Sequence, residues 1–195
     1  MAKDDIPIRL VVGLGNPGAR YEATRHNAGF WFADELARRH GALFRSESKF
    51  HGALCRIREG GRELLLLKPD TFMNRSGQSV SAVTRFFKIP PEAVLVAHDE
   101  LDIPCGAVRL KRGGGHGGHN GLRDTINQLG SKAFMRLRLG IGHPGHKDDV
   151  VGYVLSKPAP DERQGIETAI DEAAETLGWI ADAEFNKAMN RLHSL

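Results

Sequence analysis

Residues 8–30 have the sequence IRLVVGLGNPGARYEATRHNAGF, and this stretch decides the fold. Ile8 to Val12 is an apolar run that predicts a short buried strand, and Gly13 ends it. After a loop, apolar residues recur with the spacing of a core-facing helix, which is expected from about Thr24 to His40. His26 falls in the first turn of that helix, so a titratable side chain lies at a strand-to-helix junction. The stretch therefore predicts an α/β unit that carries a candidate functional residue.

The glycines of the same stretch also match a dinucleotide-binding pattern. Gly13, Gly15 and Gly18 are spaced as G-x-G-x-x-G. That motif requires a helix that begins among the glycines, with free N–H groups directed at a pyrophosphate. Pro17 removes one such donor, and no strand ends in an acidic residue about 20 residues further on. Dinucleotide binding is therefore disfavoured.

The composition is that of an ordinary globular protein, with 195 residues of which 41% are hydrophobic and 26% charged. No apolar run approaches the roughly 18 residues of a membrane-spanning helix. Met1 to Asp5 is charged, so no signal peptide is expected either. Cys55 and Cys105 are far apart and lack C-x-x-C partners. They indicate reduced thiols in a cytoplasmic protein rather than a disulfide or a zinc site.

The rest of the chain alternates further strands and helices. Strands are expected at 51–57, 63–67, 93–97, 108–110 and 136–141, and helices at 76–87, 122–129 and 161–177. The first two of these strands form a hairpin around Glu59-Gly60-Gly61-Arg62. Because no repeat or linker interrupts the pattern, residues 1–195 are expected to form a single domain, with 1–6 as a short flexible tail. The fold class is α/β: one three-layer domain with a mixed, mostly parallel twisted sheet flanked by helices.

Three expected strands are each followed by a loop that carries a polar side chain. These side chains are Asn16, Asn74 and Asp99, which follow the strands that end near residues 12, 67 and 97. In open α/β sheets, ligands bind beyond the carboxyl ends of the strands. If the three strands are parallel neighbours, the three loops meet beside His26. The sequence therefore predicts a site at this edge of the sheet.

The residue types at this edge favour an acyl-transfer reaction to water. His26 can act as a general base if Asp99 accepts its second ring N–H and fixes the tautomer. The amides of Asn16, Asn74 and Asn120 can hold a water or a carbonyl group, since an amide both donates and accepts. No Ser or Cys has a base beside it, so no covalent intermediate is expected. Structural roles remain open for each residue taken singly: a packed histidine, a turn, or a helix N-cap.

Charge is distributed unevenly along the chain. From Cys105 to Lys147 there are eight Lys or Arg residues against one acid, and from Asp161 to Glu184 there are eight acids against one base. The acidic segment is explained by a solvated helix face. The basic segment surrounds the glycine-rich run 113–121. Ordering so many glycines costs more backbone conformational entropy than ordering an ordinary loop. A polyanionic partner that approaches this backbone closely is therefore expected.

The histidines around the glycine-rich run raise the alternative of a metal site. His98, His116 and His119 are the candidate ligands. Neither an H-E-x-x-H motif nor a Cys partner accompanies them. A metal site is therefore disfavoured.

With these residues assembled, the chain resembles the bacterial peptidyl-tRNA hydrolase family from about Arg9 to Leu192. Four motifs carry the resemblance: GLGNPGxxYxxTRHNAGF, KPxTFMNxSG, HDELDIPxGxxRLKxGGGxGGHNGL and RLRLGIGHPG…VxxYVL. The resemblance implies hydrolysis of the ester between a peptide and the 3′-terminal ribose of tRNA, which recycles peptidyl-tRNA dropped by ribosomes. It also implies a cytoplasmic monomer of α/β fold that contacts the acceptor stem and CCA end, uses no cofactor or metal, and binds no membrane.

The resemblance also implies a role for each residue that matches a motif. His26 resembles the catalytic base and Asp99 its orienting partner, while Asn16, Asn74 and Asn120 resemble the side chains that position water, the carbonyl and the substrate main chain. The residues implied in substrate and tRNA binding are Tyr21, Phe72, Met73, Asn74, Asn120, Lys111 and Arg138. Arg112 and Lys147 are expected to extend the basic surface. His146 and a shortened segment, Ser131 to Phe134, depart from the family pattern on the expected tRNA side.

Two rival functions belong to other classes. Plant organellar splicing factors resemble this family but act as binding modules, so a catalytically inactive RNA-binding module on the same fold is the main alternative. A general esterase is the second. His26, Asp99 and the three asparagines favour an enzyme over the first rival, and the basic segment favours a tRNA substrate over the second.

Overall fold

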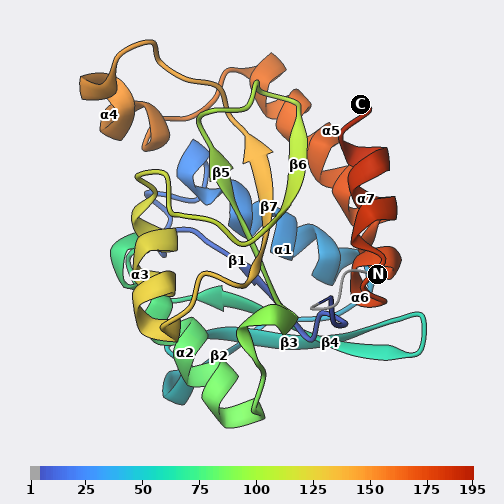
Figure 1. Ribbon diagram of the computed structural model, residues 1–195. Helices are drawn as coiled ribbons and strands as arrows, with labels where there is room; N and C mark the ends of the chain where they lie inside the picture. Colours follow the sequence, from blue (N-terminus) through green and yellow to red (C-terminus); the bar gives the residue numbers. More distant parts are fainter. Residues whose placement is uncertain (1–4) are drawn as a thin grey trace.

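The computed structural model describes residues 5–195, in which seven strands form one twisted sheet (Figure 1). The strands are β1 (Leu10–Gly13), β2 (Arg45–Glu47), β3 (Gly52–Glu59), β4 (Arg62–Pro69), β5 (Val94–Glu100), β6 (Val108–Arg112) and β7 (Met135–Gly140). Their order across the sheet is β2-β3-β4-β1-β5-β7-β6. The predicted hairpin is therefore the pair β3–β4, while β2 was not predicted.

The sheet is mixed, as expected, with its parallel part in the centre. The neighbouring pairs β4–β1, β1–β5 and β5–β7 are parallel, and β2–β3, β3–β4 and β6–β7 are antiparallel. Gly60 and Gly61 turn the β3–β4 hairpin with φ values of 58° and 118°, which residues with a side chain rarely adopt. Because β4, β1 and β5 are parallel neighbours, the three loops that follow them meet at one edge, which confirms the expected convergence.

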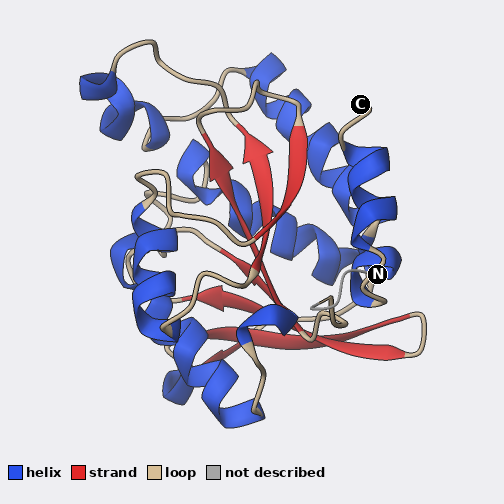
Figure 2. Cartoon of the chain, in the orientation of Figure 1, coloured by secondary structure: helices blue, strands red, loops and turns tan. Residues whose placement is uncertain are grey.

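Helices cover both faces of the sheet, which gives the predicted three layers (Figure 2). The helices are α1 (Ala28–Arg39), α2 (Ser76–Phe87), α3 (Asn120–Leu129), α4 (Val150–Val154), α5 (Pro160–Glu175), α6 (Leu177–Ala181) and α7 (Phe185–Leu192). One apolar core contains side chains of α1, α5, α6 and α7, and a second contains those of α2 and α3. None of the helices in the described part of the chain has the length and apolar character needed to cross a bilayer.

The first turn of α1 packs directly on the two central strands. A Cβ atom on Gly29 would lie 2.4 Å from the Ala97 carbonyl oxygen, and one on Gly13 would lie 2.2 Å from the Gly29 carbonyl oxygen. Both distances are far below van der Waals contact, so only glycine permits this approach. The close packing fixes the segment before α1 against the carboxyl end of β5.

The start of α1 corrects the sequence prediction, since the α-helix begins at Ala28 and not near Thr24. Thr24 is extended, with ψ of 154°, and a 3₁₀ turn, η1 (Arg25–Asn27), precedes the helix. The Asn27 side chain accepts from the Asn16 N–H at 2.9 Å and donates to the Asn16 carbonyl at 3.0 Å. These two bonds hold η1 against the loop after β1, which explains why the α-helix starts later.

Part of the predicted tail belongs to the folded domain. Residues 1–4 of the predicted segment 1–6 lie outside the described residues. Asp5 is 8% exposed and its carboxylate pairs with the Arg112 guanidinium at 2.7 Å. Ile6 packs against the core of α2 and α3. Residues 5 and 6 are therefore part of the folded domain, and the prediction was wrong for them.

The strands β6 and β7 separate apolar from basic side chains. Val108, Leu110, Leu137 and Leu139 all belong to the core beneath α5 to α7. Their neighbours in the sequence include Arg109, Lys111, Arg136 and Arg138, which face the opposite side because side chains alternate along a strand. Arg109 lies opposite Arg138 in the ladder, and Lys111 lies opposite Arg136. We call these four residues the basic face.

Candidate active site

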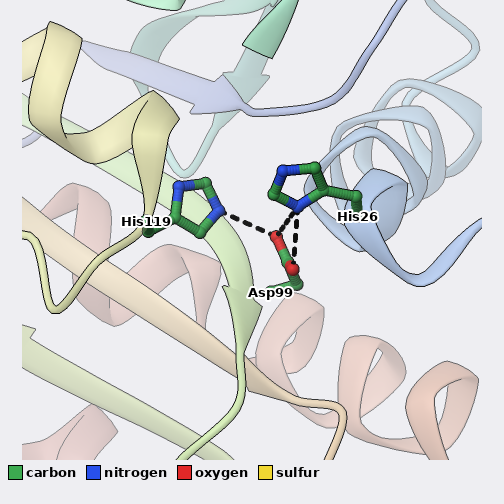
Figure 3. Close-up of side chains that lie close together, drawn as sticks. All are labelled: His26, Asp99 and His119. Atoms are coloured by element: carbon green, nitrogen blue, oxygen red, sulfur yellow. Dashed lines mark hydrogen bonds and ion pairs between the residues drawn. The ribbon is translucent and has the colours of Figure 1, made fainter. Parts of the chain in front are cut away.

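His26 and Asp99 are in direct contact at the edge where the strands end (Figure 3). His26 belongs to η1 and Asp99 to the end of β5. The distance from His26 Nδ1 is 2.9 Å to Asp99 Oδ2 and 3.0 Å to Oδ1. This contact assigns the proton of the neutral imidazole to Nδ1, because the carboxylate can only accept. The predicted proximity of the two residues is confirmed, while their catalytic roles stay a prediction.

His119 is a second partner of Asp99 that the sequence analysis did not identify in this role. Its Nε2 lies 2.8 Å from Asp99 Oδ1 (Figure 3). Its Nδ1 accepts from the N–H groups of Gly121, at 3.1 Å, and Leu122, at 3.3 Å, and so caps the N-terminus of α3. Since Nδ1 accepts two bonds, the proton of His119 is on Nε2, which donates to the carboxylate.

The two imidazoles determine the charge state of the buried carboxylate. Burial alone would raise the pKa of Asp99, but His26 and His119 together hold the pKa of this carboxyl well below its usual range. Burial lowers the pKa of His26, but the charge and hydrogen bond of Asp99 outweigh it, so the pKa is raised above 6.5. Asp99 is therefore ionised and stabilises an imidazolium on His26.

His98 precedes Asp99 and is neutral. It is 2% exposed, and its Nδ1 donates to the Asp99 carbonyl oxygen at 2.8 Å. Burial, with a smaller contribution from the nearby His119, lowers the pKa of His98 to about 3. His98 therefore contributes a hydrogen bond to the backbone at the end of β5 and no charge.

The three side chains in Figure 3 also have the spacing of a metal site, because their ligand atoms lie within 4.8 Å of one another. A histidine that ligates a metal usually donates its other ring N–H to a neighbouring acceptor. His119 does the reverse, since its Nδ1 accepts from Gly121 and Leu122. Its Nε2 therefore carries a proton where a metal would need a lone pair. The residues do not fit a metal, and the structure does not group the previously considered His98 and His116 with His119 as ligands either.

A cavity of about 550 Å³ opens over this cluster. Its lining combines polar groups with apolar side chains, some of which belong to α4. The predicted residues that line it are Asn16, His26, Phe72, Met73, Asn74, Asp99 and Asn120. The apolar lining comes from Leu101, Val150, Val151, Val154 and Leu155. A polar reaction centre beside an apolar wall suits a substrate with an ester and a peptide chain.

The three asparagines differ in how they are held. Asn16 is buried, and its Oδ1 accepts from the Met73 N–H at 2.7 Å, which ties the loop after β1 to the 3₁₀ turn η3 (Met73–Arg75). Asn74 and Asn120 are exposed at the starts of η3 and α3. His119 rather than Asn120 is the N-cap of α3, so the amide of Asn120 is not used as the cap.

Tyr21 does not line the cavity but contacts it through a neighbour. Its ring meets the Phe72 ring edge-on, with 6.3 Å between the centroids. Phe72 is 59% exposed and does line the cavity. The structure thus brings Phe72 and Met73 to the site and places Tyr21 behind Phe72.

The two residues expected to contact tRNA phosphates, Lys111 and Arg138, lie on the basic face, outside the cavity. Arg138 Nε pairs with Glu100 Oε1 at 2.9 Å, while Lys111 is exposed and has no ion pair within residues 5–195. Lys147 lines the cavity. Arg112 does not extend this surface, because it points to the other face, where it pairs with Asp5 and contacts Asn186 of α7. The sequence analysis also missed Arg109 and Arg136, which the alternation along β6 and β7 could have identified.

Comparisons with known proteins identify the family. The sequence model of the family described as "Peptidyl-tRNA hydrolase" matches residues 10–195. A peptidyl-tRNA hydrolase of Halorhodospira halophila is 57% identical over 194 residues, covering 100% of both chains, and one of Alkalilimnicola ehrlichii is 56% identical over 189 residues, covering 96% of both. The crystal structure of peptidyl-tRNA hydrolase from Acinetobacter baumannii superposes with a TM-score of 0.92 at 50% identity, covering 95% of this chain and 94% of that one. The chain belongs to the peptidyl-tRNA hydrolase family.

Proposed function

We propose that this protein cleaves peptidyl-tRNA through a water molecule that His26 deprotonates. The family and its curated relatives indicate peptidyl-tRNA hydrolase activity, which releases tRNA from peptidyl-tRNA. The observation that carries the proposed mechanism is the contact of His26 Nδ1 with Asp99. It leaves Nε2 of His26 as the basic nitrogen, and this residue lines the cavity. A general base must reach the proton that it removes, and Nε2 has no hydrogen-bond partner within residues 5–195.

The proposed reaction proceeds without a covalent intermediate. His26 Nε2 takes one proton from water as the water oxygen attacks the ester carbonyl carbon. The carbonyl oxygen becomes an oxyanion, which Asn74 or a nearby backbone N–H stabilises. When the tetrahedral intermediate collapses, the bond to the ribose oxygen breaks, and the imidazolium returns its proton to that oxygen. Asp99 supports the imidazolium between these two steps.

Three asparagines surround this reaction centre. Asn16 is held by Met73, so its amide has a fixed direction at the cavity wall. We assign to Asn16 and Asn120 the positioning of water and of the substrate main chain. Asn74 of η3 and Asn120 of α3 both line this cavity. An amide can donate to a carbonyl and accept from an N–H at the same time, which suits a peptide.

The tRNA is proposed to bind along the basic face. Lys111 and Arg138 lie there and would contact phosphates of the acceptor stem and CCA end. Tyr21, Phe72 and Met73 would contact the terminal adenosine and the peptide. We further propose that the protein acts as a monomer in the cytoplasm, where ribosomes release the substrate.

The test is release of an N-acetylated amino acid from its tRNA in the presence of EDTA. Aminoacyl-tRNA without the N-acetyl group serves as the substrate control, and a His26→Ala variant serves as the enzyme control. Cleavage of the N-acetylated substrate alone, lost in the variant and unaffected by EDTA, is expected. Tight tRNA binding without cleavage would instead support the RNA-binding module. Cleavage abolished by EDTA would contradict the role proposed for the histidines.

A further inference from the structure

The loop of residues 113–118, which joins β6 to α3, is held from beneath by a buried arginine. Arg136 of β7 is 2% exposed. Its Nη1 donates to the Gly115 carbonyl at 2.7 Å, and its Nη2 donates to the carbonyls of Gly114 and Lys132. The guanidinium also stacks on the Phe134 ring, 4.1 Å from the centroid. Arg136 therefore fixes the direction of two successive peptide groups in the loop.

This direction leaves two N–H groups pointing outward. In a trans peptide the carbonyl and the N–H point in opposite directions. Because the carbonyls of Gly114 and Gly115 point toward Arg136, the N–H groups of Gly115 and His116 point away from it. Within residues 5–195 neither N–H has a hydrogen-bond partner. Gly115 is exposed, and a Cβ atom built on it meets nothing within 4 Å, so a side chain at this position would enter open space.

The charge around the loop is positive. A Cβ atom on Gly114 would lie 2.9 Å from the Lys111 ammonium nitrogen, so this ammonium lies against the loop. Arg136 is paired with carbonyl oxygens, and no described carboxylate balances its charge. Successive outward N–H groups beside a cation form a concave site that favours an anion. A loop with these features suits a phosphate group.

We propose that the loop of residues 113–118 binds a backbone phosphate of the tRNA next to the scissile ester, through the N–H groups of Gly115 and His116 and the ammonium of Lys111. Arg136 is a positioning residue, because it holds the two N–H groups outward and does not touch the phosphate. His116 and two following glycines line the cavity that contains His26, which places this phosphate close to the ester. The inference rests on the proposed function and adds the phosphodiester that this site recognises.

The experiment compares two small substrates that differ in phosphate. N-acetylaminoacyl-adenosine has the ester and no phosphate, whereas N-acetylaminoacyl-CpCpA adds two phosphodiesters. Arg136→Lys keeps the charge but loses the planar fork that holds two carbonyls. Gly115→Val places a bulky side chain in the open space and leaves the core untouched, so it reports even if Arg136→Lys fails to fold. Arg191→Lys on α7 is the matched arginine control.

We expect both loop variants to lose about tenfold in kcat/KM on the CpCpA substrate, the loss typical of one hydrogen bond to a charged group. Their kcat/KM on the adenosine substrate should stay unchanged, and Arg191→Lys should match the wild type on both. Equal losses on the two substrates, or no loss on CpCpA, would overturn the phosphate site alone. Failure of the wild type to cleave full N-acetylaminoacyl-tRNA would overturn the proposed function, and the phosphate site with it.

Discussion

His119 donates a hydrogen bond to the Asp99 carboxylate, with 2.8 Å between Nε2 and Oδ1. His26 Nδ1 contacts the same oxygen at 3.0 Å and Oδ2 at 2.9 Å, so the carboxylate cannot rotate without losing a bond. Because the same imidazole caps α3, the position of Asp99 is linked to the start of that helix. The relationship makes His119 a positioning residue for the base, and it leads to the first prediction.

The two functions of His119 can be separated by substitution. His119→Asn retains a side chain that caps helices well but is too short to hold Asp99. We expect it to lower kcat by about tenfold with little change in KM, since a loosened base is misplaced. His119→Ala should lose the cap as well and reduce the free energy of unfolding by about 1 kcal/mol. Steady-state kinetics and chemical denaturation measure the two effects, and full kcat in His119→Asn would contradict the positioning role.

Removing the base should affect chemistry far more than binding. His26→Ala is expected to lower kcat by roughly 10²–10⁴ because general base catalysis is lost. The affinity for tRNA, measured by filter binding, should be nearly unchanged. His51→Asn is the control, because His51 is exposed and has a left-handed backbone that Asn tolerates. A large loss of affinity with an unchanged kcat would reverse the role given to His26.

The acid limb of the pH profile should report His26. Only the neutral imidazole can accept a proton, so kcat/KM should fall as the pH drops through a pKa above 6.5. Asp99→Asn removes the charge that raises this pKa, so the limb should move to lower pH while kcat decreases. An unmoved limb in Asp99→Asn would show that another group titrates.

The same pKa predicts a pH dependence of stability. A histidine with a raised pKa stabilises the folded state fully below its unfolded pKa of 6.5, and this contribution is lost as the pH rises through the folded pKa. The free energy of unfolding is measured by denaturation for the wild type and for Asp99→Asn, from below pH 6.5 to above the folded pKa of His26. The wild-type value minus the variant value should decline as the pH rises. A stability difference that grows with pH would contradict the predicted direction.

The basic face should make activity depend on salt. Lys111→Gln removes one contact to a phosphate, so the slope of log affinity against log salt should become shallower by about 1. KM should rise and kcat should stay the same. Lys187→Gln removes the same charge from α7, on the other side of the sheet, and is the control. Equal slopes in Lys111→Gln and wild type would place the phosphates elsewhere.

Glu100 should oppose tRNA binding. It pairs with Arg138 at 2.9 Å and so neutralises part of the basic face. Glu100→Gln is expected to lower KM for peptidyl-tRNA by roughly two- to fivefold at low salt, the gain of about one partly exposed charge interaction. Arg138→Gln should raise KM. Measuring KM and kcat of both variants at two salt concentrations distinguishes the charge effect from a change in kcat. A higher KM in Glu100→Gln than in the wild type would contradict the role given to Glu100.

Continuous apolar strands made the centre of the fold predictable. Every residue of β1 is buried, and the runs in β4 and β5 are similar, which is typical of strands covered on both faces. The helix predicted at 76–87 has the observed bounds. α7 was missed because its apolar face consists of few residues, and such a short helix depends on packing rather than on its own propensity.

The candidate site was predictable where it depends on strand ends. The His26–Asp99 contact follows from β1 and β5 being parallel neighbours. His119 reaches Asp99 as the N-cap of α3. Separately, Arg136 holds the preceding loop of residues 113–118 across 21 residues of sequence. No local pattern indicates that a buried arginine will bind distant glycine carbonyls. Such a contact emerges only from the assembled sheet.

The separation of charge between the two faces of the sheet affects how the protein meets its substrate. β6 and β7 direct their basic side chains away from α5, whose exposed residues include Asp161, Glu167 and Asp171. Basic and acidic side chains therefore lie on opposite sides of the sheet. We expect the field of an approaching tRNA to turn the molecule before contact, so that the basic face meets the tRNA first. We therefore expect this asymmetry to raise the association rate as well as the affinity.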